Sequence, residues 1–294
     1  EAGRGSPLLA QYITVENSSF TDNGGLGGDI YLVADGPGAA GLQQIEVSNS
    51  AFSGNLVGLG LGETAINSAA AQQNALLTND SLTDNFYVGG AFFSTAMTQG
   101  FASQSVAVYG SPDHAFDITG NGSDGIWLRS RAYYGGNVEQ NAKIYYANIS
   151  HNGGDGVYVD TLASGYTKGA YTYYYSQITS YVVGAFASLN HNAGSGVRID
   201  NLVEAGGQLN QFAELYGVTL NSNAAYGALE HSVDSGYLYP GSSYGLTTQL
   251  YSDLYVVNAS ASHNGLSGLG VQAEGYGPAY MIQHLTSEGV NATR

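Results

Sequence analysis

One short phrase recurs along the sequence, and the spacing of its copies limits the fold more than any other feature. Each copy holds an Asn with a Gly close behind it, as in TDNGGLGGDIYL from Thr21 and SHNGGDGVYV from Ser150. Successive Asn residues lie 32, 30, 36, 31, 40, 31 and 41 residues apart, an average of about 34, which is typical of a tandem array with loop insertions. The eight positions are Asn23, Asn55, Asn85, Asn121, Asn152, Asn192, Asn223 and Asn264.

Other columns of the repeat keep the same register. An apolar residue stands three places before every Asn, so Phe20, Phe52 and Leu82 should line one interior column. In the stretch that leads up to the Asn of each unit, apolar and polar residues alternate as in a half-buried strand. A second short strand follows the Gly. Because Asn tolerates and Gly favours positive φ, we expect a tight turn between the two strands. A Gln stands twelve places before the Asn in five units, at Gln11, Gln43, Gln73, Gln140 and Gln211.

Equivalent positions carry the same residue type from unit to unit, and this property separates stacked parallel coils from an array of hairpins. In a parallel stack each column becomes a ladder, with Asn above Asn bonded through the side-chain amides and apolar side chains above one another inside. The sequence therefore predicts an all-β solenoid in which the eight Asn residues form a structural ladder.

The corner formed by Asn121, Gly125, Ile126 and Leu128 resembles that of right-handed parallel β-helices of the pectate-lyase-like type, particularly the repeat-rich forms in bacterial adhesins and autotransporter passengers. The resemblance covers eight units, about residues 11–271. It implies a single right-handed β-helix domain over residues 1–294, with eight to nine coils, the ninth beginning near Met281, as a segment of a longer protein. That superfamily includes lyases, hydrolases, epimerases, tailspikes and inert stalks, so the resemblance does not choose an activity.

Composition narrows the class of partner. The chain has 7 Lys and Arg against 23 Asp and Glu, so its surface repels nucleic-acid phosphates and anionic lipid headgroups. We therefore expect no nucleic-acid partner. No apolar run approaches the roughly 18 residues of a transmembrane helix, so we expect no transmembrane segment. The absence of Cys excludes disulfides and thiolate chemistry.

The two longest intervals place insertions at 164–184 and 234–255, and both are rich in Tyr. Tyr offers an apolar face and a polar tip with little rotamer entropy to lose, which suits a carbohydrate-stacking or protein-docking surface. Alternate Tyr residues would also decorate the outer faces of strands without any ligand, because aromatic residues are favoured there. Our candidate ligand-binding residues are Tyr171, Tyr173, Tyr175, Tyr237, Tyr239 and Tyr244.

Glycan cleavage needs carboxylates brought together, often beside a cation. Asp124 and Asp155 each stand three residues after their Asn, so they would stack one coil apart, and they are our catalytic candidates if the protein is an enzyme. The same place holds Val88 in the unit before and Ser195 in the unit after, which weakens the pair as a site. Further acidic and basic candidates are Asp117, Asp160, Asp200, Arg129, Arg131 and Arg198.

Metal binding has two weak signals. The stretch GGLGGDIYL from Gly24 matches a calcium-binding nonapeptide, but no second copy follows within nine residues, so we favour a chance match on a Gly-rich corner. Scattered carboxylates are the other candidate ligands for calcium, since calcium is a hard ion that prefers oxygen. His151, His191 and His263 each precede an Asn of the ladder, and we interpret them as a solvent-facing polar column rather than a zinc site. His151 and His191 would be about 5 Å apart if their units are adjacent.

Two functions fit these observations. The preferred one is a secreted or surface-displayed structural module, such as an adhesin stalk or fibre segment, whose Tyr-rich loops contact carbohydrate or another surface protein. The alternative is an extracellular polysaccharide-processing enzyme, a lyase, hydrolase or epimerase, that uses carboxylates on one solenoid face. Carboxylates converging from several coils beside the insertions would favour the enzyme. Uncapped solenoid ends also expose unpaired strands, so we expect a continuing chain, self-association or end-to-end stacking.

Overall fold

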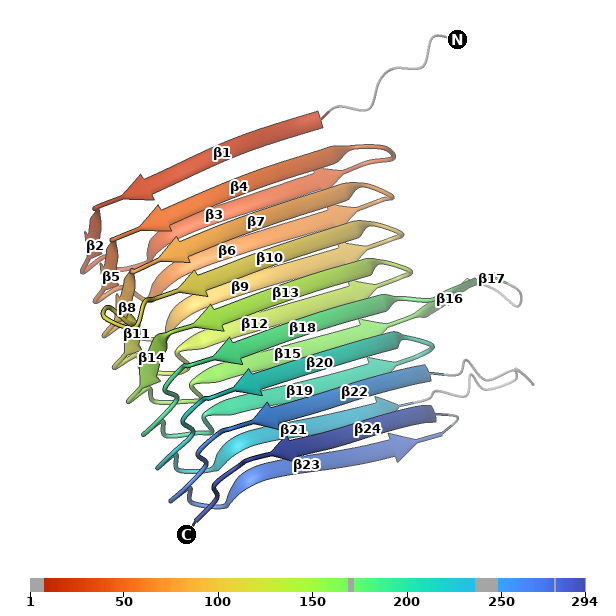
Figure 1. The fold of residues 1–294 in the computed structure, drawn as a ribbon. Coiled ribbons are helices and arrows are strands. Elements are labelled where there is room, and N and C mark those ends of the chain that lie inside the picture. Colours follow the sequence, from red (N-terminus) through yellow and green to blue (C-terminus); the bar gives the residue numbers. More distant parts are fainter. Residues whose placement is uncertain (1–7, 169–171, 236–247, 278, 294) are drawn as a thin grey trace.

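The computed structural model describes residues 8–168, 172–235, 248–277 and 279–293, and this part of the chain is all-β. Three parallel sheets, here called A, B and C, form the sides of a solenoid (Figure 1). Neighbouring strands in each sheet belong to successive coils and pair in parallel register. The described residues contain no helix that could cross a membrane.

Within each sheet the strands have closely matched lengths, and those of sheet B are the shortest, with 3 or 4 residues. Sheet A consists of β1 (Leu8–Glu16), β4 (Ala40–Ser48), β7 (Ala70–Thr78), β10 (Phe101–Tyr109), β13 (Asn137–Tyr145), β18 (Gln177–Ala185), β20 (Gln208–Tyr216), β22 (Thr248–Val257) and β24 (Ala279–Glu288). Sheet B consists of β2 (Ser19–Thr21), β5 (Ala51–Ser53), β8 (Ser81–Thr83), β11 (Phe116–Thr119) and β14 (Ala147–Ser150). Sheet C consists of β3 (Leu26–Asp35), β6 (Val57–Ile66), β9 (Val88–Met97), β12 (Ile126–Tyr133), β15 (Val157–Ser164), β19 (Val197–Glu204), β21 (Tyr226–Ser235) and β23 (Ser267–Tyr276).

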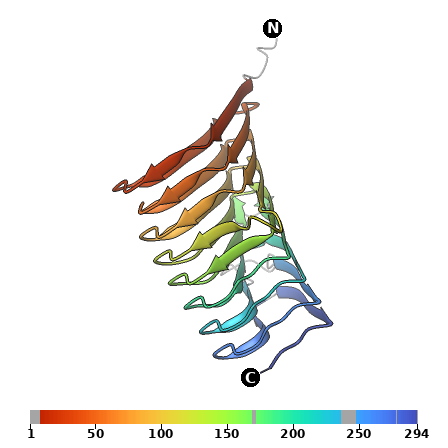
Figure 2. The same cartoon turned by 60° about the vertical axis from the view of Figure 1, so that its left-hand side comes forward.

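Each coil passes through sheets A, B and C in turn and then returns to sheet A one level further on (Figure 2). Eight coils are complete, and β24 begins a ninth close to the expected Met281. After β14, sheet B continues as single parallel bridges between successive coils. Phe20 pairs with Phe52 and Phe52 with Leu82, and the two Phe rings stack with their centroids 4.8 Å apart. The prediction of a right-handed parallel β-helix with shared interior columns is confirmed.

The corner between sheets B and C is built on the Asn column. Asn85 Nδ2 donates to Asn121 Oδ1 at 2.9 Å, and Asn121 Nδ2 donates to Asn152 Oδ1 at 2.9 Å. The same bond joins every successive pair from Asn23 to Asn264. Because the Asn backbone amide also donates to the next Asn side chain, each coil is held to the next by side-chain and backbone bonds together.

The turn chemistry differs from our expectation. The left-handed residue of the corner is the one directly before the Asn, as at His151 with φ 58° and Asp84 with φ 54°. The Gly four places after the Asn does not have positive φ. It is required by packing instead, since a Cβ on Gly125 would lie 2.7 Å from the carbonyl oxygen of Gly156 in the next coil. The Gly column therefore reflects the close approach of two backbones.

A polar row runs through the interior beside the apolar core. Gln43 Nε2 donates to Gln11 Oε1 at 2.8 Å, and the ladder continues through Gln73, Gln104 and Gln140. We had not expected Gln104 in this column, because the loop of residues 110–115 shifts its distance from the next Asn. The row divides the buried apolar residues into two clusters, one toward sheet B and one toward the opposite edge.

The first insertion leaves sheet C at the end of β15 and contains the antiparallel strands β16 (Tyr166–Lys168) and β17 (Thr172–Tyr174). It is shorter than the expected 164–184, because Gln177–Ala185 forms β18 of sheet A. Similarly, β21 ends at Ser235 and β22 resumes at Thr248, so the end of the expected range 234–255 belongs to sheet A. Both insertions thus follow strands of sheet C, at one edge of that sheet (Figure 1).

Candidate functional site

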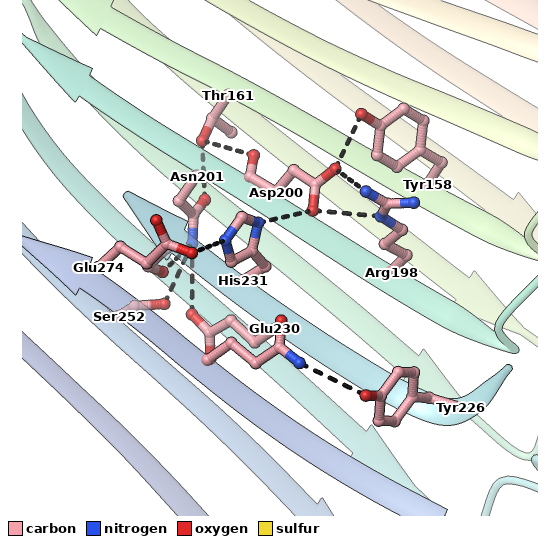
Figure 3. Close-up of polar contacts among 12 residues, drawn as sticks. Tyr158, Thr161, Arg198, Asp200, Asn201, Tyr226, Glu230, His231, Ser252 and Glu274 are labelled. Carbon is pink, nitrogen blue, oxygen red and sulfur yellow. Dashed lines mark hydrogen bonds and ion pairs between the residues drawn. The ribbon is translucent and has the colours of Figure 1, made fainter. Parts of the chain in front are cut away.

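The outer face of sheet C carries a cluster of charged and polar side chains from four successive coils. We call Tyr158, Arg198, Asp200, His231 and Glu274 the Asp200 cluster (Figure 3). They lie on β15, β19, β21 and β23, and in β15 and β19 the outward positions alternate with buried ones. Two of these strands, β15 and β21, lead directly into the insertions. Carboxylates from β19 and β23 thus flank His231 on a sheet whose strands lead into the insertions, which is part of the convergence that we expected of an enzyme.

Asp200 is the centre of this cluster. Arg198 lies 2.8 Å from Asp200 Oδ2 through its Nη2, and its Nε donates to Oδ1 at 3.2 Å. The hydroxyl of Tyr158 donates to Oδ2 at 3.1 Å. The register of β19 with β21 places His231 beside Asp200, with Nδ1 3.7 Å from Oδ1. One carboxylate thus orients a guanidinium, a phenol and an imidazole.

Burial and charge define the protonation of Tyr158. Burial, the carboxylates of Asp160 and Asp200, and its bond to Asp200 raise the pKa of the Tyr158 phenol well above its ordinary value. The guanidinium of Arg198 lies over the Tyr158 ring, 5.5 Å from the centroid, and partly offsets this rise. Tyr158 is therefore a hydrogen-bond donor throughout the neutral pH range.

His231 lies between two carboxylates. Its Nδ1 faces Asp200, and its Nε2 is 3.7 Å from Glu274 Oε1 on the next coil. The His231 side chain is 29% exposed, so a ligand on this face can reach it. The His231 imidazole therefore has a carboxylate on each side and is open to a ligand bound on this face.

Asp160 occupies the same outward column but has a different partner. It forms an ion pair with Arg131, whose Nη1 also donates to the Asp160 carbonyl at 2.9 Å. Asp160 stands between Arg129 and Asp200 in the register of sheet C. Three of the seven Lys and Arg residues of this acidic chain therefore lie on one sheet face, Arg129, Arg131 and Arg198.

The catalytic candidates Asp124 and Asp155 lie one coil apart at the corner before sheet C. Asp124 Oδ1 accepts the backbone N–H of Asp155 at 2.7 Å, and Asp155 Oδ1 accepts that of Ser195 at 2.5 Å. Burial raises the pKa of Asp155 to about 6 and also raises that of Asp124, while Arg198 lowers both. These carboxylates hold successive turns together and add negative charge beside Arg198. Asp117 is apart from them on sheet B, where it accepts a bond from Asn148.

An aromatic hollow lies on the same face of sheet C, three coils away from Asp200. It has a volume of about 370 Å³, and we define it by the residues that give it its shape. Small outward residues of β6 and β9 leave the space of the hollow free. Large aromatic side chains from neighbouring coils surround it. The defining residues are Tyr31, Gly60, Gly62, Tyr87, Ala91, Phe93 and Trp127.

The six Tyr residues that we predicted to bind a ligand belong to the two insertions. Tyr171, Tyr237, Tyr239 and Tyr244 lie outside the described residues. Tyr173 belongs to β17, for which only the backbone is described. Tyr175 follows β17 and is 50% exposed. A ligand-binding role for these six residues stays a prediction.

The His column is a stack at the outer corner. The rings of His151 and His191 lie 5.1 Å apart and are nearly parallel. Among the described residues, no group of three or more His, Asp or Glu side chains is arranged to hold a metal ion. A role for calcium remains untested.

His231, Tyr158 and Trp127 are functional candidates that the sequence reading missed. A signal for His231 was present, because it stands eight residues after Asn223, as Asp160 and Asp200 stand eight residues after their own Asn. The residue type at this outward position changes from coil to coil. A search for a repeated residue therefore does not find the column. Its members are Tyr31, Gly62, Phe93, Arg129, Asp160, Asp200, His231 and Gln272.

No protein-family model and no curated protein matches the sequence. Among solved structures, a double mutant of the periplasmic alginate epimerase AlgG is similar at 13% identity and a TM-score of 0.24, over 83% of this chain and 77% of that one. The A-module of the Azotobacter vinelandii mannuronan C-5 epimerase AlgE4 is similar at 13% identity and a TM-score of 0.25, over 96% of this chain and 91% of that one. Scores this low carry no functional argument. The strand pairing itself makes the chain a parallel β-helix with three sheets.

Proposed function

We propose that this protein is a polysaccharide-processing enzyme that holds an extended glycan along the outer face of sheet C. The observation that supports this most is the convergence of Tyr158, Arg198, Asp200, His231 and Glu274 from four coils on the outer face of sheet C. A structural module needs no such cluster, because strand pairing and the Asn ladder already hold the coils together. We therefore place the enzyme ahead of the adhesive or stalk-like module that the sequence favoured.

The cluster provides the groups that acid–base chemistry on a sugar requires. His231 is the proposed proton acceptor and donor, and Asp200 and Glu274 face its two ring nitrogens at 3.7 Å. Arg198 is 43% exposed at its side chain, so it can contact a substrate while Asp200 orients it. Tyr158 holds Asp200 in place through its hydroxyl. These roles serve lyase, hydrolase and epimerase reactions alike, and the reaction type is left to experiment.

A long polysaccharide also agrees with the shape of the molecule. Successive coils are about 4.8 Å apart, so the seven strands from β3 to β21 offer a face roughly 29 Å long. A substrate of this kind implies that the protein works outside the cytoplasm, in an extracellular or periplasmic setting. Contacts from the Tyr-rich insertions to the same glycan are part of this proposal.

The experiment is to incubate the protein with pectate, alginate, hyaluronan and a soluble cellulose derivative, and to follow the products by NMR. This measurement detects cleavage, elimination and epimerisation alike. His231→Gln should lower turnover at least about 100-fold, the range in which general acid–base groups act. His114→Gln, which alters an exposed His in the loop of residues 110–115, is the matched control. Turnover that survives His231→Gln would refute the assignment of the cluster.

A further inference from the structure

The aromatic hollow has a specific structural origin. The outward column that runs from Asp29 to Trp127 contains Gly60 and Ala91 at the two coils between them. Next to it, Gly62 lies directly under Tyr31, and a Cβ on Gly62 would come within 2.2 Å of the Tyr31 ring. Tyr31 therefore lies against bare backbone. The hollow depends on two outward Gly residues in one strand, β6.

The hollow is apolar at its base and has aromatic walls. Trp127 meets the ring of Phe93 edge to face at 5.1 Å and that of Tyr87 at 6.4 Å. Tyr31 is 51% and Tyr87 46% exposed, so part of each ring is accessible to a ligand. Sites for small ligands combine such apolar walls with a few polar groups, and a volume of about 370 Å³ is within their usual range.

Two polar groups near the Trp127 end lack partners, one on Trp127, which lines the hollow, and one on Arg129, which does not line it but lies against the Trp127 and Phe93 rings. Trp127 Nε1 is buried and makes no hydrogen bond within the described part of the chain. The guanidinium of Arg129 lies 5.8 Å from the Trp127 ring and 5.9 Å from the Phe93 ring. Its Nε is also buried without a partner, and no carboxylate among the described residues forms an ion pair with it. Asp29, which lines the far end, is exposed.

We propose that the aromatic hollow is a subsite for a short stretch of an acidic glycan that crosses three coils, about 14 Å. The apolar face of one bound residue stacks against Tyr31 and lies over Gly60 and Ala91, and Asp29 accepts from hydroxyl groups. The carboxylate of a residue further along the same stretch binds Arg129 beside Trp127. An unpaired guanidinium beside aromatic rings favours a carboxylated sugar over a neutral one, because its charge otherwise stays uncompensated.

The position of the hollow gives the direction of the glycan. Gly60 and Ala91 lie on β6 and β9, whereas Asp200 lies on β19, three coils beyond β9. At about 4.8 Å per coil this separation is about 14 Å, so the bound residue is a few sugars away from the Asp200 cluster on one extended chain. This inference rests on the proposed function, since it assigns the substrate class and a remote subsite to the same sheet face.

Trp127 makes the inference directly measurable, because it is the single Trp of the chain. Its fluorescence should change on titration with oligogalacturonides of graded length, and cello-oligosaccharides should give a weaker response. Tyr31→Ala removes one wall and Gly60→Leu fills the space, and each should weaken binding about tenfold. Tyr12→Ala, which removes an exposed Tyr from sheet A, should leave the titration unchanged. Thermal melting checks that every variant is folded.

Charge recognition is tested at Arg129. Arg129→Gln should weaken oligogalacturonide binding about tenfold or more and leave cello-oligosaccharide binding unchanged. Arg129→Lys should restore part of the loss. Equal losses for both sugars would refute the acidic specificity.

The outcomes separate this inference from the proposed function. A Trp127 response without turnover supports the subsite and refutes the enzyme. Turnover with no Trp127 response, or with unchanged KM in Tyr31→Ala and Gly60→Leu, refutes the subsite and retains the enzyme. If the fluorescence of Trp127 changes with none of the oligosaccharides, the subsite is refuted.

Discussion

The Nδ1 atom of His231 lies 3.7 Å from Oδ1 of Asp200, although the two residues are 31 positions apart in the sequence. They are direct neighbours in adjacent parallel strands, β19 and β21. The same Asp200 carboxylate binds Arg198 and Tyr158. Asp200 therefore links the proposed proton-transfer group to the proposed substrate-binding cation.

Replacing Asp200 should impair turnover more than stability. Asp200→Asn keeps the shape of the side chain but removes the charge that holds Arg198 and His231. We expect kcat/KM to fall about 100-fold, within the range of acid–base positioning effects. The melting temperature should change little, because the pairs are partly exposed to solvent. Asp35→Asn on the same sheet is the control, and equal activity in the two variants would contradict the role of Asp200.

Removing one Asn from the middle of the ladder should destabilise the protein strongly. Asn152 Nδ2 donates to Asn192 Oδ1 and to the carbonyl of Ile118, while Asn152 Oδ1 accepts two bonds from Asn121. Asn152→Ala leaves several buried groups unpaired, so we expect a loss of about 3 kcal/mol or more in urea denaturation. Asn23→Ala, at a partly exposed position, should cost about 1 kcal/mol.

The Gly column should tolerate no side chain. A Cβ on Gly125 would lie 2.6 Å from Ile149 Cγ2, 2.7 Å from the Gly156 oxygen and 2.9 Å from Asn152 Nδ2. Since two of these atoms belong to the hydrogen-bonded corner, Gly125→Ala should cost about 3 kcal/mol. Gly24→Ala enters open space and should be neutral or slightly stabilising. Comparable melting temperatures for the two variants would show that the corners can move apart.

Stability should fall with rising pH because of Glu63. Burial inside sheet C raises the pKa of Glu63 from 4.5 to about 8, partly offset by a bond from Ser94. Below pH 4.5 both folded and unfolded states hold the proton, so Glu63 has no effect. Between 4.5 and 8 the unfolded state ionises while the folded state stays protonated, so the free energy of unfolding decreases as pH rises.

Glu63→Gln should remove the share of this dependence that Glu63 contributes, while the buried Glu230, whose pKa is also raised to about 8, keeps its own share. We expect the variant to match the parent protein near pH 4.5 and to exceed it near pH 8 by a few kcal/mol, on the order of 1.4 kcal/mol for each unit of pKa. Urea denaturation across this range measures the difference. Glu46→Gln, on the exposed face of sheet A, should leave the slope unchanged.

The sequence predicted the interior of the fold better than its surface. The columns of Asn, Gln and apolar residues repeat in type, because each rung must match the one above it, and Phe20, Phe52 and Leu82 are stacked as predicted. The turn was assigned to the wrong residue. We predicted positive φ at Gly125. The structure shows instead that Gly125 must lack a Cβ because the backbone of Gly156, one coil away, approaches it closely, and the local sequence does not predict this contact.

The sequence alone thus determined the period, the interior ladders and the number of coils, since parallel stacking places equivalent residues on top of one another. Only the tertiary structure decided which outward side chains meet. Asp200 binds Arg198 within its own strand and faces His231 from the next, while Asp124 and Asp155 turn to backbone amides. The physical reason is that an outward column is free of packing constraints, so its chemistry changes at each coil and becomes a site only through the register of neighbouring strands.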